Sequence, residues 1–128
     1  MAVKYADGVV LGADSRTSTG TYVANRASDK ITRICDNVWM CRSGSAADTQ
    51  NVAAYVSRLA EEHAVSVSSA AAGAEERLTC DVKLVANLTK TIAYENKERL
   101  QAGMIIAGWD RKLGPQVYGI PLGGALVE

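Results

Sequence analysis

The sequence contains a single histidine, His63, and only three cysteines, Cys35, Cys41 and Cys80. No two cysteines stand in a CxxC spacing, whereas closed zinc sites usually need four cysteine or histidine ligands at short spacings. We therefore expect no metal site. The same scarcity argues against a Ser-His-Asp or Cys-His protease. The three cysteines are expected to be reduced, mostly buried thiols of a cytosolic or nuclear protein.

The chain also lacks an excess of charge and any long apolar run. Lys and Arg number 14, Asp and Glu number 14, and the net charge is zero. This balance argues against a nucleic acid or an anionic membrane as the main partner. No apolar run approaches the roughly 20 residues that a membrane-spanning helix needs, and the first residues show no signal peptide. The 128 residues, 48% of them apolar, are expected to form one domain with a core.

Short apolar runs separated by turn signals predict strands in the first third of the chain. Asp7-Gly8 predicts a hairpin turn, because glycine accepts the positive φ of tight hairpins. Asp36-Asn37 predicts a second turn. The polar segment 14–20 is expected to be a loop. The expected strands are 1–5, 9–13 (apolar on both faces and so buried between layers), a short piece at 22–24, then 31–34 and 38–42.

The hydrophobic period changes after residue 44 to that of a helix. Ser45 is the expected N-cap, with Asp48 as a capping-box variant, and the helix is expected to run to about His63. Residues 64–74 are rich in Ala and Ser and are read as a linker, a loop or a frayed helix end. Further predictions are a second helix over 81–100, strands over 102–109 and 116–120 around a loop at 110–114, and a turn at 123–124. This order predicts an α+β fold with helices packed on a sheet.

Several segments resemble the signature of the proteasome β subunits. Residues 9–20 read Val-Val-Leu-Gly-Ala-Asp-Ser-Arg-Thr-Ser-Thr-Gly, and the similarity continues through Asn25-Arg26 and Asp29-Lys30-Ile31. It returns in residues 41–50, Cys-Arg-Ser-Gly-Ser-Ala-Ala-Asp-Thr-Gln, and in 102–110, Ala-Gly-Met-Ile-Ile-Ala-Gly-Trp-Asp. The resemblance is close over 1–50 and 102–128 and weak over 51–101. Arg42 before Ser43-Gly44 resembles the caspase-like (β1) type.

The resemblance implies the four-layer αββα sandwich of the N-terminal nucleophile hydrolases, of which residues 1–128 would form one partial β-type domain. It implies peptide hydrolysis by an N-terminal threonine whose own α-amine serves as the base, so that neither a histidine nor a cofactor is needed. In the family this threonine stands just before the position of Met1, so the 128 residues do not include it. A later Asp and Ser of the family would lie beyond Glu128.

Three residues match family positions with catalytic roles. Lys30 matches the catalytic lysine, whose cation would lower the pKa values of the threonine hydroxyl and amine. Asp14 matches an aspartate that would hold this ammonium charged and in place. Gly44 matches the glycine whose N–H forms the oxyanion hole. The plain alternatives are a surface lysine, a turn aspartate and a turn glycine.

Four further residues match family positions that contact substrate. Arg42 matches a position facing the S1 pocket, where a guanidinium would pair with an acidic P1 side chain. A strand-end arginine on a solvated face, or one paired with an internal acid, is the alternative. Thr17, Ser18 and Ala46 match positions whose backbone pairs with extended substrate.

Three functions remain open at this stage. The first is a proteasome threonine endopeptidase that cleaves after acidic residues, and the second is a structural ring subunit without activity. The third is an unrelated α+β binding module. The resemblance implies other α and β subunits in stacked rings as partners and unfolded polypeptides as substrates. It also implies a location in cytoplasm and nucleus, with no nucleic acid or membrane partner.

Overall fold

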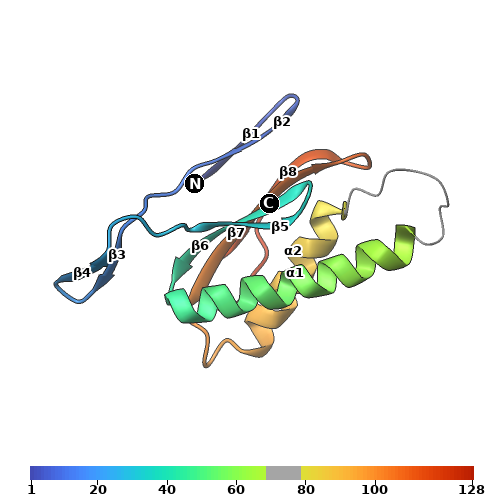
Figure 1. Cartoon of the computed structure of the whole chain (residues 1–128). Helices are drawn as coiled ribbons and strands as arrows, with labels where there is room; N and C mark the ends of the chain where they lie inside the picture. The colour runs from blue at the N-terminus through green and yellow to red at the C-terminus, as the bar shows by residue number, and fades with distance from the viewer. Residues whose placement is uncertain (69–78) are drawn as a thin grey trace.

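A four-stranded antiparallel sheet forms the centre of the molecule. The computed structural model describes residues 1–68 and 79–128 (Figure 1). The strands of this sheet lie in the order β5-β6-β7-β8. They are β5 (Ile31–Cys35), β6 (Val38–Gly44), β7 (Ala102–Asp110) and β8 (Gly114–Ile120). The predicted hairpins around Asp36-Asn37 and around 110–114 are confirmed, and β6 pairs with β7 from Val38–Gly108 to Gly44–Ala102.

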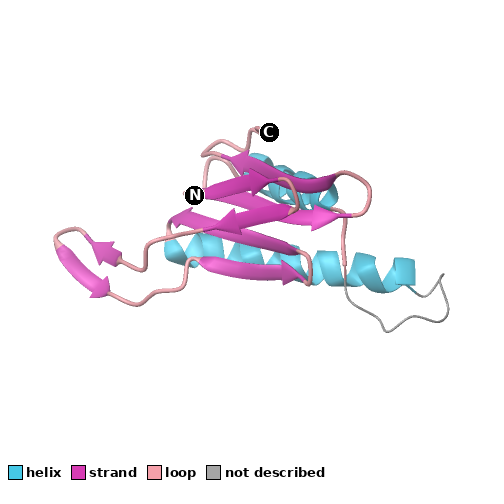
Figure 2. Cartoon of the chain, turned by 90° about the horizontal axis from the view of Figure 1, so that it is seen from above, coloured by secondary structure: helices cyan, strands magenta, loops and turns pink. Residues whose placement is uncertain are grey.

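Two helices, α1 (Ala46–Ser68) and α2 (Val82–Glu95), cover one face of this sheet (Figure 2). Because side chains alternate along a strand, Val38 and Met40 of β6 point toward the helices, and both are fully buried. Val56 of α1 and Val85 of α2 are fully buried as well. The core therefore lies between the helices and the sheet, and the predicted α+β class is confirmed.

The other face of the sheet carries a hairpin formed by β1 (Ala2–Tyr5) and β2 (Gly8–Leu11), which contacts β7 and β8 (Figure 1). The predicted hairpin is confirmed, but its turn lies one residue earlier, at Ala6-Asp7, because Tyr5 pairs with Gly8. Gly8 is the first residue of β2 and does not adopt the positive φ that the prediction assumed. The expectation that 9–13 is buried on both faces is wrong. The strand ends at Leu11, and Val10 is 59% exposed because only one face of the hairpin meets the sheet.

A second hairpin, β3 (Thr17–Thr19) with β4 (Tyr22–Asn25), projects from the main body (Figure 2). The prediction of a loop over 14–20 is therefore wrong in part. Three β-branched or hydroxyl residues pair with the extended piece expected at 22–24. Gly20 supplies the positive φ, +60°, that the turn between them requires.

Both helices differ in length from the prediction. α1 continues past His63 to Ser68, because Ala60 and Ala64 extend the buried line of Val52 and Val56 at intervals of four. Of the segment 64–74, residues 64–68 are helical and 69–74 lie outside the described residues. α2 ends at Glu95 rather than near 100, because the Asn96 side chain and N–H both donate to the carbonyl of Ile92.

The C-terminal turn is confirmed, with positive φ at Gly123 and Gly124. Gly124 lies so close to α2 that a Cβ would stand 2.5 Å from the Tyr94 nitrogen. Val127 then pairs with Gly119 at the edge of β8. Among the described residues, no helix is long and apolar enough to cross a membrane.

Candidate active site

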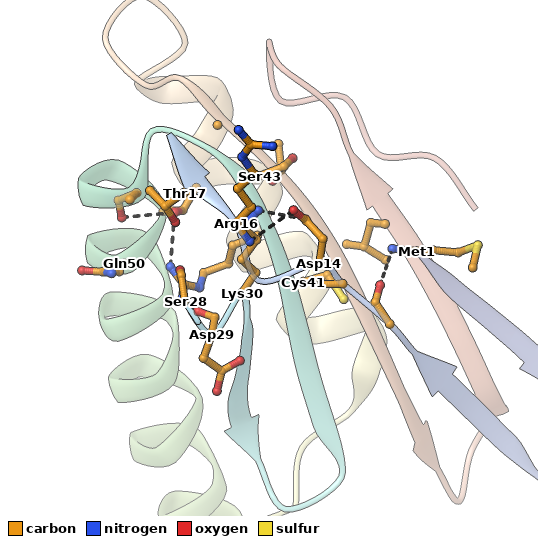
Figure 3. Close-up of a pocket in the computed structure, with 18 of the residues that line it drawn as sticks. Met1, Asp14, Arg16, Thr17, Ser28, Asp29, Lys30, Cys41, Ser43 and Gln50 are labelled. Atoms are coloured by element: carbon orange, nitrogen blue, oxygen red, sulfur yellow. Dashed lines mark hydrogen bonds and ion pairs between the residues drawn. The ribbon is translucent and has the colours of Figure 1, made fainter. Parts of the chain in front are cut away.

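A cavity of about 640 Å³ opens where the ends of β5 and β6, the first turn of α1 and the segment 12–18 meet (Figure 3). All seven residues singled out from the sequence line it: Asp14, Thr17, Ser18, Lys30, Arg42, Gly44 and Ala46. Met1 lines the same cavity, and its amine donates a 2.8 Å hydrogen bond to the carbonyl of Gly12. The fold therefore brings residues from four separate segments to one place.

Lys30 and Asp14 form the ion pair that the sequence predicted. The Lys30 Nζ lies 2.8 Å from Asp14 Oδ1, and the two side chains face one another in Figure 3. Asp14 Oδ2 accepts a hydrogen bond from the Arg16 backbone N–H at 3.3 Å. These two contacts, the lysine first, hold the pKa of the Asp14 carboxyl below its usual value. The Lys30 side chain is 25% exposed and directed at the cavity rather than extended into solvent.

Gly44 is the last residue of β6, two residues before the start of α1, and the position admits no side chain. Its φ is +101°, and a Cβ would lie 2.2 Å from the carbonyl oxygen of Gln101. The next residue, Ser45, donates its N–H to that carbonyl at 2.7 Å. The Ser45 hydroxyl accepts from the Asp48 N–H at 3.4 Å, which confirms the predicted N-cap. The Asp48 carboxylate accepts from the Gln101 N–H instead of completing a capping box.

Arg42 is half-buried between the sheet and the first turn of α1, and not on a solvated face. Its Nε donates to Thr32 Oγ1 at 2.9 Å, and its Nη1 donates to Thr49 Oγ1 at 3.3 Å. Its Nη2 donates to the backbone carbonyl of Asp29 at 2.6 Å. In the described part of the chain Arg42 has no acidic side chain within ion-pair distance. Its positive charge therefore faces the cavity without a carboxylate to balance it.

The remaining predicted residues line the cavity near the positive charge of Arg42. Thr17 and Ser18 begin β3, and the Ser18 hydroxyl accepts from Arg16 Nε at 3.3 Å. Ala46 is the first residue of α1, where the positive end of the helix dipole adds to the field of Arg42 and Lys30. The positively charged side chains of Arg42 and Lys30 and the strand β3 thus lie at the same cavity.

Sequence reasoning missed the residues that hold Arg42. Thr32 lies on β5 beside the arginine, and Thr49 lies one helical turn past Ser45. Strand alternation could have placed Thr32 on the helix side of the sheet, but nothing in the sequence indicated that Thr49 accepts from a strand residue. The contact with Asp29 is made to its backbone carbonyl. Every residue has such a carbonyl, so the sequence does not indicate which one accepts a hydrogen bond from Arg42.

The cysteines are free and buried, as expected. Cys35 Sγ lies 3.0 Å from Cys80 Sγ in the core, and Cys41 borders the cavity. Burial raises the pKa of the Cys41 thiol. Within residues 1–68 and 79–128, no group of three or more His, Cys, Asp or Glu side chains is placed to hold a metal ion. Trp39 and Trp109 are 38% and 45% exposed and do not belong to the core.

The fold and the cavity together define a layered α+β protein with a basic site between a sheet edge and a helix N-terminus. The family model described as proteasome subunit matches residues 1–128, which includes the 51–101 region. The chain is 54% identical over 128 residues to proteasome subunit beta type-6 of Arabidopsis thaliana. It is 48% identical over 126 residues to proteasome subunit beta type-1 of Saccharomyces cerevisiae.

These matches cover 100% and 98% of the chain but 51% and 54% of the two relatives. The chain therefore spans about half the length of the curated relatives that it matches. It belongs to the proteasome subunit family, and its similarity is to the β-type subunits of the 20S core.

Proposed function

We propose that the full-length protein is a threonine endopeptidase of the caspase-like type in the 20S proteasome core, cleaving after acidic residues. Its main support is the grouping of Lys30, Asp14, Gly44 and Arg42 around one cavity. The nucleophile in this proposal is a threonine that precedes Met1. Met1 itself lines the cavity. The relatives support the β-subunit class, and experiment must decide the choice of substrate.

In the proposed reaction each residue has one task. The threonine hydroxyl attacks the scissile carbonyl while the threonine amine takes its proton, so no histidine is needed. The C–N bond then breaks, the leaving amine takes that proton, and water hydrolyses the resulting threonine ester to release the acid and restore the enzyme. The Lys30 ammonium, held by Asp14, lowers the pKa values of both threonine groups. The Gly44 N–H stabilises the oxyanion, and the absence of a side chain lets the carbonyl approach.

In this proposal two kinds of group recognise the substrate: backbone groups of the protein and one charged side chain. Thr17, Ser18 and Ala46 present backbone groups that pair with an extended peptide, which reads the chain but not its side chains. Arg42 lies at the cavity and has no acidic partner among residues 1–68 and 79–128, which favours a carboxylate at P1.

The proposal extends to the assembled protein. Residues 1–128 would be one partial domain of a four-layer αββα sandwich. The β1–β2 hairpin would form the first part of the second sheet. Val3 and Val10 of this hairpin are more than half exposed in the described part of residues 1–128, and the rest of the second sandwich half would cover them. The neighbours would be other α and β subunits in stacked rings, in cytoplasm and nucleus. The substrates would be unfolded polypeptides, with no role for nucleic acid or membrane.

The test uses the full-length protein in its assembled particle, with matched peptides carrying Glu, Leu or Arg at P1. Lys30→Ala is expected to abolish cleavage after Glu. Arg42→Ala is expected to lower kcat/KM for the Glu peptide roughly 10- to 100-fold, because a charge-assisted contact is lost. Lys112→Ala is the control, because this lysine is also paired with an aspartate, Asp81, but lies at the β7–β8 turn.

Unaltered cleavage after Glu in Lys30→Ala would mean that the subunit is a structural member of the ring. Equal rates on the three peptides, or unchanged selectivity in Arg42→Ala, would show that Arg42 does not determine P1 preference.

A further inference from the structure

The guanidinium of Arg42 is fixed at three of its nitrogen atoms by three different parts of the chain. Thr32 on β5 accepts from Nε, Thr49 on α1 accepts from Nη1, and the carbonyl of Asp29 accepts from Nη2. An exposed arginine side chain samples many rotamers, and holding it in one costs entropy. Three hydrogen bonds to separate elements set that orientation before any ligand arrives.

Thr49 is suited to this task because its hydroxyl proton is already used. Its Oγ1 lies 3.0 Å from the carbonyl of Ser45 and 3.2 Å from that of Ala46, so it donates into the first turn of α1. The lone pairs of the oxygen are then left to accept from Arg42. Thr49 is only 2% exposed, so water does not compete for this contact.

All three acceptors are neutral, and they leave part of the guanidinium unused. Arginine has five N–H groups, one on Nε and two on each Nη. Among the described residues Nε, Nη1 and Nη2 each donate once, which leaves one further N–H on each Nη nitrogen. The oxygens of a carboxylate can accept from such N–H groups.

We propose that Thr32 and Thr49 are positioning residues that set the preference for an acidic P1 side chain by fixing the Arg42 fork. This rests on the proposed peptidase function and adds which residues hold the guanidinium in place. A freely rotating cation would attract the same charge less selectively, because its donors would not be held in one orientation.

The experiment compares P1 Glu with P1 Gln, which have the same shape but different charge, in the assembled full-length protein. Thr32→Val and Thr49→Val keep the side-chain volume and remove the hydroxyl. Each is expected to raise KM for the Glu peptide roughly tenfold, with kcat and the Gln peptide little changed. Such a split indicates lost binding that is equal in ground and transition states. Thr32→Ser, which restores the hydroxyl, is expected to restore KM.

Thr89→Val is the matched control for Thr49→Val. Thr89 is a fully buried helix residue whose hydroxyl also donates to a carbonyl four residues back, that of Val85, but it lies on α2 away from Arg42. Its KM for the Glu peptide is expected to stay at the wild-type value. If Thr49→Val does not assemble, Thr32→Val with its serine rescue decides alone.

The two proposals fail in different ways. If Lys30→Ala leaves cleavage after Glu intact, the peptidase proposal is wrong. If Lys30→Ala abolishes that cleavage but the valine variants keep the wild-type KM, or raise KM equally for Glu and Gln, the positioning role is wrong.

Discussion

At the scale of single residues, buried polar groups in this protein are placed where several hydrogen bonds meet. Asp110, at the end of β7, is 7% exposed. Its carboxylate accepts from the backbone N–H groups of Val82, Lys112 and Leu113 and from the side chain of Gln116. One carboxylate thereby joins the start of α2 to the β7–β8 turn.

These contacts lead to a prediction about pH. Burial alone would raise the pKa of Asp110, but the hydrogen bonds from Leu113, Val82, Gln116 and Lys112 outweigh it and leave the pKa below 3.8. A folded-state pKa below the unfolded value means stability that is present above about pH 3.8 and lost as pH falls through the folded pKa. Asp110→Asn is therefore expected to lower the unfolding free energy near neutral pH by about 1–3 kcal/mol. Urea unfolding of the full-length protein over a series of pH values measures this.

The control for Asp110 is Asp81→Asn, nearby but 42% exposed and paired with Lys112. Its loss should cost much less than the loss of the Asp110 carboxylate, because exposed ion pairs contribute little to stability. A difference between Asp110→Asn and wild type that stays constant down to acid pH would contradict the assigned role of the carboxylate.

At the scale of elements, the sheet depends on close backbone approach as well as on side chains. Gly108 of β7 pairs with Val38 at the β5–β6 turn. A Cβ on Gly108 would lie 2.2 Å from the carbonyl oxygen of Asn37, which also accepts from the Trp109 N–H. The clash is with backbone that is itself hydrogen-bonded, so no side-chain rotation relieves it.

Gly108→Ala is accordingly expected to destabilise the protein by about 1–3 kcal/mol or more through overpacking. Gly119→Ala on the neighbouring strand is the matched control, because its nearest contact would be an ordinary 3.9 Å to Val127. Thermal unfolding of the two variants measures the difference. Equal melting temperatures would show that β6 and β7 can separate enough to admit the extra methyl group.

Element type was predictable from sequence where one physical signal dominated. The hairpin at Asp36-Asn37 and the start of α1 at Ser45 follow from turn and capping chemistry, and the structure has them. The first hairpin is present as well, with its turn one residue before Asp7-Gly8. The β3 strand was missed because its three short polar residues carry no apolar alternation, and its pairing with β4 stabilises it instead. The ends of α1 and α2 were missed because tertiary contacts, Ala64 in the core and Asn96 at the cap, decide them.

For the candidate site, the residues were predictable and their supports were not. The family motifs led to Asp14, Lys30, Arg42 and Gly44, and the ion pair between the first two is present. The contacts that hold Arg42 depend on the packing of α1 against the end of β6. Such packing follows from the three-dimensional fold and has no local pattern in the sequence.

At the scale of the whole molecule, the four strands of the sheet lie in their chain order, but the connections between them differ greatly in length. β5 and β6 are joined by a tight turn, as are β7 and β8. The central pairing of β6 with β7 spans everything between Gly44 and Ala102, including both helices. That same pairing brings Gln101 to Ser45 and Asp48 and so closes the Gly44 turn.

The time order of folding follows from this arrangement. Hairpins close over short loops and form early, whereas a pairing across a long insertion waits until its loop entropy is repaid. We expect amides of β5–β6 and β7–β8 to gain protection before those that join β6 to β7, as pulse-labelled hydrogen exchange of the refolding full-length protein would measure. Simultaneous protection of all four strands would contradict this. The turn that carries Gly44 is then among the last parts to become rigid, so a chain still in the course of folding has its strands before it has its site.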